Sequence, residues 1–289
     1  MNCIACGEDL DNAKSLLIQS DIFADRKYYV KICECGLGTT EITEDGTAQE
    51  ANDIMYNDLS RRVDIYFHKL RGHFEARYKD TLNLIEKCAP PGKKILEIGS
   101  NIGFTLNIAK NNWYDVTGCE LNDKCREISK LLWDIPVEKD FFAINKKFDI
   151  IVMCDVLEHL PDPNIALKKI HSLLNDKGLL FIQLPNIQSK LCLKLKERWG
   201  FWCIPDHRFH FTVESLSALL AKNGFEETFH RTVGIYDRHF IWKLIYPRRL
   251  RHHLLNIMNS IFKIGFRKTK GTDGELIQIV AIRNFSHKK

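Results

Sequence analysis

Short apolar runs alternate with amphipathic runs between residues 93 and 186 of the chain. The apolar runs predict buried strands at 94–99, 115–120, 136–140, 148–154 and 178–184. The amphipathic runs predict helices at 104–111, 123–132 and 165–174. Strands that alternate with helices along a chain form a parallel sheet with helices on both faces. The predicted fold class is therefore α/β, with a doubly wound sheet.

The flanking residues divide the chain into a small N-terminal module, a helical linker and the sheet domain. Apolar positions three to five residues apart predict one or two helices between 46 and 91, which end at Ala89-Pro90-Pro91-Gly92. We expect domains at 1–45, 46–91 and 92–289, with insertions at 188–205 and 236–272 and a last strand at 275–282. Packing explains the aromatic residues of the linker better than a substrate-pocket wall does; they are Tyr56, Tyr66, Phe67, Phe74 and Tyr78.

Four of the ten cysteines form two close pairs near the N-terminus, Cys3 with Cys6 and Cys33 with Cys35, and a glycine follows each pair. Two such turns can supply four thiolates to a tetrahedral zinc ion. A module of about 45 residues has too small a core to fold without such support. We expect a zinc-ribbon-like module with a structural zinc, because four cysteine ligands leave no open position for catalysis. Free or redox-active thiols are the alternative, and the other six cysteines are expected to fill the core.

Composition and charge narrow the class of protein. The chain is 45% hydrophobic and 27% charged, which excludes a disordered chain, a collagen-like repeat and a disulfide-rich miniprotein. The sequence contains no apolar run of about 18 residues and no signal-peptide pattern, so we expect a cytoplasmic protein. The net charge is +5, but residues 237–270 alone carry nine Lys/Arg and one Asp, a local +8, so that the remainder carries −3. A nucleic-acid-binding stripe along the whole chain is therefore not indicated.

Each insertion has two or more interpretations. Residues 188–205 contain Trp199, Phe201 and Trp202 among basic residues, and they form either a lid over a substrate pocket or ordinary packing. Residues 237–270 combine apolar and basic residues. A helical pair packed on the domain with a basic rim is the first interpretation. Peripheral membrane contact or a lipid-linked acceptor is the second, and nucleic acid is the least favoured partner.

A glycine-containing turn follows the first predicted strand of the sheet, with Gly99 and Gly103 four residues apart. Glycines let the backbone approach a ligand closely, and Asn101 between them belongs to a residue type that tolerates positive φ. The turn alone is a weak nucleotide signal. Glu120 strengthens it, because a carboxylate at the end of the next strand can accept both hydroxyls of a ribose. The dinucleotide fingerprint Gly-x-Gly-x-x-Gly is absent, so a pyrophosphate cradle is not the best interpretation.

Together these residues resemble the class I S-adenosylmethionine-dependent methyltransferases. The resemblance runs from residue 93 to 186 and rests on 96–103, Glu120, 139–141, 148–163 and 178–186. A weaker resemblance over 206–216 and 223–225 is similar to a subgroup with a cysteine-rich N-terminal ribbon. Members of that subgroup methylate oxygen or carbon in polysaccharide, quinone or other small-molecule biosynthesis.

The resemblance implies a Rossmann-like sheet and a set of cofactor contacts. Backbone at Gly99 and Gly103 would pass the methionine moiety, and Glu97 would orient that loop and meet the cofactor's amino group. Glu120 would bind the ribose hydroxyls. The remaining contacts would come from Asp140, which accepts from the adenine amine, from Phe141 beside the ring, and from 153–155, ending at Asp155, beside the sulfonium.

Methyl transfer also needs a group that removes the acceptor's proton, and histidine is the default base near neutral pH. His159, His207 and His210 lie where the family places the mouth of its active site. Capping or packing is the alternative for His159, and fixing the loop around Arg208-Phe209 is the alternative for the other two.

The leading function is methyl transfer to oxygen or carbon of a small-molecule or glycan-type acceptor. RNA methylation with the zinc ribbon and basic segment is a second candidate. Against it, residues 155–158 lack the Asn/Asp-Pro-Pro-aromatic tetrad that surrounds an exocyclic base amine. A non-catalytic zinc-ribbon interaction protein on a cofactor-binding scaffold is the third, and retention of Glu120, Asp140 and the histidines argues against it.

Overall fold

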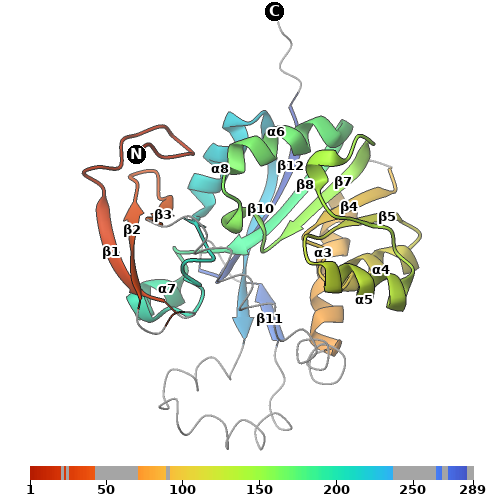
Figure 1. The fold of residues 1–289 in the computed structure, drawn as a ribbon, viewed down its shortest axis with the longest axis horizontal. Coiled ribbons are helices and arrows are strands. Elements are labelled where there is room, and N and C mark those ends of the chain that lie inside the picture. The colour runs from red at the N-terminus through yellow and green to blue at the C-terminus, as the bar shows by residue number, and fades with distance from the viewer. Residues whose placement is uncertain are drawn as a thin grey trace, which may run out of the picture.

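The computed structural model describes residues 1–20, 23, 26–42, 71–88, 92–236, 265–268 and 273–284. These residues form a small four-stranded sheet and a large eight-stranded sheet (Figure 1). The linker up to residue 70 and the insertion from 237 to 264 lie outside the described residues. Expectations for the basic segment 237–270 therefore fall almost wholly outside them. Within the described part of the chain, no helix is both long and apolar enough to cross a membrane.

The large sheet has the strand order β11-β10-β12-β8-β7-β4-β5-β6. Its parallel part comprises β4 (Lys94–Ile98), β5 (Asp115–Cys119), β6 (Val137–Glu138), β7 (Phe148–Cys154) and β8 (Leu174–Pro185). Three antiparallel strands extend the β8 edge: β10 (Phe225–Tyr236), β11 (Gly265–Lys268) and β12 (Leu276–Arg283). The predicted strands and the predicted doubly wound fold class are confirmed.

Helices cover both faces of this sheet (Figure 1). On one face lie α3 (Arg71–Cys88), α4 (Phe104–Asn111) and α5 (Asp123–Trp133). On the other lie α6 (Pro163–Leu173) and α8 (Val213–Lys222). Strand side chains alternate between the two cores: Ile150 belongs to the cluster that includes Leu106 of α4, and its neighbour Ile151 belongs to the cluster that includes Ile170 of α6. Burial on both faces explains why β7 is almost wholly apolar.

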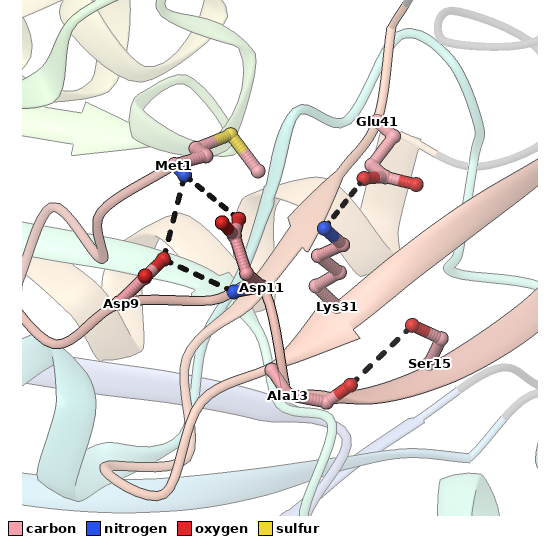
Figure 2. A network of polar contacts seen from close by, with 7 residues as sticks. All are labelled: Met1, Asp9, Asp11, Ala13, Ser15, Lys31 and Glu41. Carbon is pink, nitrogen blue, oxygen red and sulfur yellow. Dashed lines mark hydrogen bonds and ion pairs between the residues drawn. The ribbon is translucent and has the colours of Figure 1, made fainter.

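The small sheet joins the N-terminal module to the rest of the chain. Its strands are β1 (Lys14–Gln19), β2 (Lys27–Ile32), β3 (Gly38–Thr40) and β9 (Phe209–His210). Figure 2 shows polar contacts in this module, including Lys31 Nζ to Glu41 Oε1 at 2.9 Å and the Met1 amino group with Asp9 and Asp11. Because β9 belongs to the loop that precedes α8, the module completes its sheet with a strand from the sheet domain.

The insertion at 188–205 packs against this module. It contains α7 (Lys190–Leu195) and a 3-10 turn (Lys196–Arg198). Trp199 and Trp202 are buried in one cluster with Ile18 and Val30 of the N-terminal sheet. The two tryptophans therefore contribute to packing, and the lid over the acceptor stays a prediction.

Candidate active site

A cavity of about 190 Å³ lies at the carboxyl ends of β4, β5 and β7. Four of the seven predicted cofactor-binding residues line it: Glu97, Gly99, Glu120 and Asp155. Carboxyl ends of parallel strands are where open α/β sheets bind ligands. The loops that leave these three strands bring together residues far apart in the sequence.

The loop after β4 needs left-handed backbone at three places. Gly99, Asn101 and Gly103 have φ of 76°, 49° and 77°. A Cβ at Gly99 would lie 2.3 Å from Cγ2 of Val156, so a larger residue does not fit there. Asn101 stabilises its own turn, since its Oδ1 accepts from the backbone N of Ile102 at 2.8 Å. Gly103 sits at the N-cap of α4, outside the lining of the cavity.

Glu120 follows β5 and is held by backbone groups from two loops. Its Oε2 accepts from the N of Asn101 and its Oε1 from the N of Asn122, both at 2.9 Å. Only 7% of the residue is exposed, and it lines the cavity. Each carboxylate oxygen has a second lone pair, so the orientation leaves room for two hydroxyl donors.

Glu97 is the more deeply buried of the two buried glutamates that line the cavity. Burial raises its pKa to about 8, an effect that a hydrogen bond from Thr105 opposes and the charge of Glu120 reinforces. Its Oε2 has no hydrogen-bond partner among the described residues. A buried acceptor without a partner is costly, and a ligand ammonium group would both satisfy it and favour the ionised form.

Asp155 follows β7 and makes an ion pair with a helix outside the predicted site. Its Oδ2 lies 3.0 Å from Nη2 of Arg77 on α3. Arg77, Tyr78 and Thr105 also line the cavity. The motifs did not indicate Arg77 or Thr105, and Tyr78 was interpreted mainly as packing. Tyr78 both lines the cavity and packs on a neighbouring ring, since its ring centroid lies 5.9 Å from that of Phe104.

Asp140 and Phe141 lie beyond the cavity. The Oδ1 of Asp140 caps a 3-10 turn by accepting from the N of Phe142 at 2.9 Å. Phe141 is buried in the core on the α6 side, whereas Phe142 is 45% exposed. The structure therefore presents Phe142, not Phe141, to solvent beside Asp140, and the adenine contacts stay predictions.

The three predicted catalytic histidines come together near the loop that follows β7. The ring centroids of His159 and His207 are 4.6 Å apart, and those of His207 and His210 are 6.3 Å apart. None of the three lines the 190 Å³ cavity. His207 and His210 are buried, while the side chain of His159 keeps 27% of its exposure.

Their surroundings give these histidines different pKa values. Burial lowers the pKa of His210 to about 3 and that of His207 well below 6.5. Burial also acts to lower the pKa of His159, but a hydrogen bond with Asp206 and the charge of Glu158 outweigh it and raise the value to about 9. A general base works best with a pKa near the operating pH. None of the three histidines has a pKa near neutral pH.

The four paired cysteines converge on one point. Sγ of Cys3 lies 3.6 Å from Sγ of Cys35, and Sγ of Cys6 lies 3.5 Å from Sγ of Cys33, with all four sulfurs within 4.8 Å of one another. Four thiolates around tetrahedral zinc lie about 3.8 Å apart, given Zn–S bonds of about 2.3 Å. The following glycines, Gly7 and Gly36, both have φ of 88°. The arrangement fits a zinc ion.

Residues 66–228 match a family model described as a methyltransferase domain, which is more than half of the 289-residue chain. The chain belongs to this methyltransferase family. The resemblance inferred from the motifs is thus confirmed.

Individual relatives match this methyltransferase domain over shorter stretches than the family model does. The ubiquinone biosynthesis O-methyltransferase of Bordetella avium is 27% identical over 109 residues, covering 34% of this chain and 45% of its own. The tRNA U34 carboxymethyltransferase of Aliarcobacter butzleri is 38% identical over 84 residues, covering 28% of this chain and 27% of its own. The chain spans about half the length of the ubiquinone enzymes that it matches.

Solved structures show the same fold. A SAM-dependent methyltransferase of Thermotoga maritima has a TM-score of 0.54 at 20% identity, covering 80% of this chain and 99% of its own. Magnesium protoporphyrin IX methyltransferase of Synechocystis, solved with bound SAH, has a TM-score of 0.54 at 13% identity, covering 83% and 100%. The Rossmann-like methyltransferase architecture is confirmed.

Proposed function

We propose that the protein transfers a methyl group from S-adenosylmethionine to an oxygen, or a carbon, of a small-molecule or glycan-type acceptor. The observation that carries the proposal is the cavity at the ends of β4, β5 and β7, with Glu120 fixed by two backbone donors and Glu97 buried without a full set of partners. When bound, S-adenosylmethionine supplies an electrophilic methyl on a sulfonium.

Different residues of the chain would bind different parts of the cofactor. Glu120 would accept from the ribose hydroxyls and Glu97 from the ammonium group, while Gly99 admits the chain of the methionine end. Arg77 and Asp155 would close the side of the cavity reached from α3. Holding the methyl donor in one position turns a bimolecular displacement into a nearly unimolecular one.

The acceptor would approach from the side of Asp155 and the three histidines. The end of β7 and the loop that carries β9 would form this side. One of His159, His207 and His210 would then take the proton of an acceptor hydroxyl. A zinc ion on Cys3, Cys6, Cys33 and Cys35 would stabilise the N-terminal module and take no part in transfer.

The relatives in ubiquinone biosynthesis are O-methyltransferases, which favours an oxygen acceptor. An RNA acceptor has support from the tRNA carboxymethyltransferase relative over a shorter stretch. The segment 155–158, Asp-Val-Leu-Glu, has no aromatic ring to stack on a base, which places RNA second.

The test is transfer of radiolabelled methyl from S-adenosylmethionine to an acceptor panel. The panel contains hydroxylated aromatic compounds, sugar nucleotides and bulk tRNA, and binding of S-adenosylhomocysteine is measured alongside by calorimetry. Label in a low-molecular-mass hydroxyl compound is the expected result. Label only in tRNA would overturn the acceptor class, and absence of cofactor binding would overturn the enzyme assignment.

A further inference from the structure

A second group of ligand-type side chains lies beside the cofactor cavity. Glu158, His159 and His207 each offer one ligand atom, and these atoms lie within 4.8 Å of one another. None of them belongs to the cysteine cluster. Two imidazoles and one carboxylate form a donor set that binds divalent transition metals and leaves coordination positions open.

The carboxylate of this group is buried with nothing to satisfy it. Glu158 is 1% exposed, and neither of its side-chain oxygens has a hydrogen-bond partner among the described residues. An unpartnered buried carboxylate is among the most costly groups in a protein interior, so such groups are normally paired or coordinate a metal. This observation is independent of the spacing of the three residues and itself points to a missing ligand.

Both histidines are already oriented through the same ring nitrogen. Nδ1 of His159 lies 3.2 Å from the backbone O of Asp206 and 3.2 Å from its Oδ1. Nδ1 of His207 lies 3.1 Å from the backbone O of Phe201. Carbonyl and carboxylate oxygens accept, so Nδ1 carries the hydrogen when each ring is neutral, and in that form Nε2 has the lone pair that a metal would use. Metal-binding histidines characteristically donate their second nitrogen in this way.

We propose that Glu158, His159 and His207 bind a divalent transition metal ion at the acceptor side of the cofactor cavity. Val156 and Asp155, two and three residues before Glu158, line that cavity, so the ion would lie beside it. His159 is the partly exposed member, which leaves an approach for an acceptor. If the proposed methyl transfer holds, the ion would bind the acceptor oxygen and lower its pKa, which is standard metal-ion catalysis.

This assignment changes the roles of the histidines. As ligands, His159 and His207 would need their Nε2 lone pairs for the metal and would not act as proton acceptors. His210 has its Nε2 2.8 Å from the hydroxyl of Thr40, so it faces a different partner. The acceptor class implied is one with an oxygen that can bind a metal ion, such as a phenol, an enol or an adjacent pair of hydroxyls.

The experiment is a titration with Mn²⁺, followed by loss of the free-ion electron paramagnetic resonance signal. The full-length protein is first given one equivalent of zinc per chain, which the four thiolates take up in preference, so that the carboxylate and imidazole ligands stay available to manganese. We expect one Mn²⁺ per chain, and binding weaker by about tenfold or more in Glu158→Gln and His207→Ala. Asp206→Asn keeps all three ligands but alters the orientation of His159, and should weaken binding about tenfold.

The matched control is His230→Ala. His230 is an exposed histidine on β10 that pairs with Glu227, so it also brings an imidazole together with a carboxylate but lies outside the cluster. Manganese binding should be unchanged. Absence of stoichiometric Mn²⁺ binding in wild type, or equal binding in wild type and in the folded Asp206→Asn and Glu158→Gln variants, overturns the proposal. No acceptor or cofactor is needed in the assay, so failure of methyl transfer leaves its result intact.

Discussion

The hydroxyl of Thr40 connects the N-terminal module to His210. Its Oγ1 lies 2.8 Å from Nε2 of His210 and donates to the backbone O of His207 at 2.9 Å. Since the hydroxyl hydrogen is used on the carbonyl, Nε2 of His210 carries the hydrogen and its Nδ1 is the basic nitrogen. A residue in the cysteine-rich module thus sets the tautomer of a candidate base.

Thr40→Val should therefore disturb both stability and turnover. Valine keeps the shape but leaves a buried imidazole N–H and a carbonyl without their partner, which costs about 1–3 kcal/mol. We expect that loss in urea unfolding together with reduced turnover at unchanged cofactor affinity. Thr39→Val is the control, because neighbouring strand residues face opposite ways. Equal effects of the two substitutions would contradict the assigned role.

Glu120→Ala should weaken binding of S-adenosylmethionine. Losing two charge-assisted hydrogen bonds costs roughly 2–4 kcal/mol after water re-enters, or about 30- to 1000-fold in Kd. Calorimetry measures the change. Glu138→Ala, on the exposed neighbouring strand β6, should leave Kd near its wild-type value. Unchanged affinity in Glu120→Ala would show that this carboxylate does not bind the cofactor.

Cofactor affinity should depend on pH through Glu97. Its pKa is raised to about 8 in the protein without ligand, so the group is neutral below that pH. If the ionised form meets the cofactor's ammonium group, binding releases a proton and affinity rises as the pH approaches 8. Calorimetry in two buffers of different ionisation enthalpy counts the protons. The cofactor's own amino group titrates in the same range, so the difference from Glu97→Gln isolates this carboxyl.

Glu97 should affect the stability of the fold in the opposite direction to cofactor affinity as the pH rises. A carboxyl whose folded pKa of about 8 exceeds the ordinary 4.5 binds more protons when folded, so the protein loses stability as pH rises from about 4.5 to 8. Unfolding of Glu97→Gln should have a flatter pH dependence over that window. A parallel pH dependence in the two proteins would mean that Glu97 is not buried as described.

Protein purified without chelator should contain one zinc per chain at Cys3, Cys6, Cys33 and Cys35. Cys6→Ser should release it, whereas Cys88→Ser, outside the cluster, should not. Chelation should speed hydrogen exchange in β1 to β3 while β7 stays protected, because the metal supplies the stability of the small module. A metal content well below one per chain would contradict the zinc assignment.

One of the three histidines should act as the base. Alanine at that position should lower turnover by about 10² to 10⁴, remove the acidic limb of the pH profile and leave cofactor affinity nearly intact. His210→Ala is the most informative variant, because His159 and His207 serve as metal ligands under the assignment above. Wild-type turnover in all three alanine variants would leave positioning alone to carry the reaction.

The sequence predicted those parts of the site that depend on local spacing. Gly99, Asn101 and Glu120 lie just after the ends of two predicted strands. The order of the strands therefore indicates that these residues come close together. Arg77 could not, because it reaches Asp155 from a helix 78 residues earlier in the chain. The motif position puts Phe141 beside the adenine, and this stays a prediction. Packing decides which of the two neighbouring rings faces the core, and here it is Phe141 that is buried and Phe142 that is exposed.

The two-residue strand β9 was also beyond sequence patterns, because two residues carry no periodicity. Its pairing with β3 puts Thr39 opposite Phe209 and Gly38 opposite His210. The same pairing explains why Gly38 is glycine: a Cβ there would lie 3.0 Å from the Cβ of His210.

The shared small sheet has a consequence for synthesis. Thr40 and His210 are separated by 170 residues, so the cysteine-rich module cannot complete its sheet during synthesis until β9 has been made. At about 5–20 residues per second, that interval is roughly 10–30 s. During that time the edge of β3 is open and the thiols are accessible. Early capture of zinc would protect the nascent module from aggregation and oxidation before its final strand arrives.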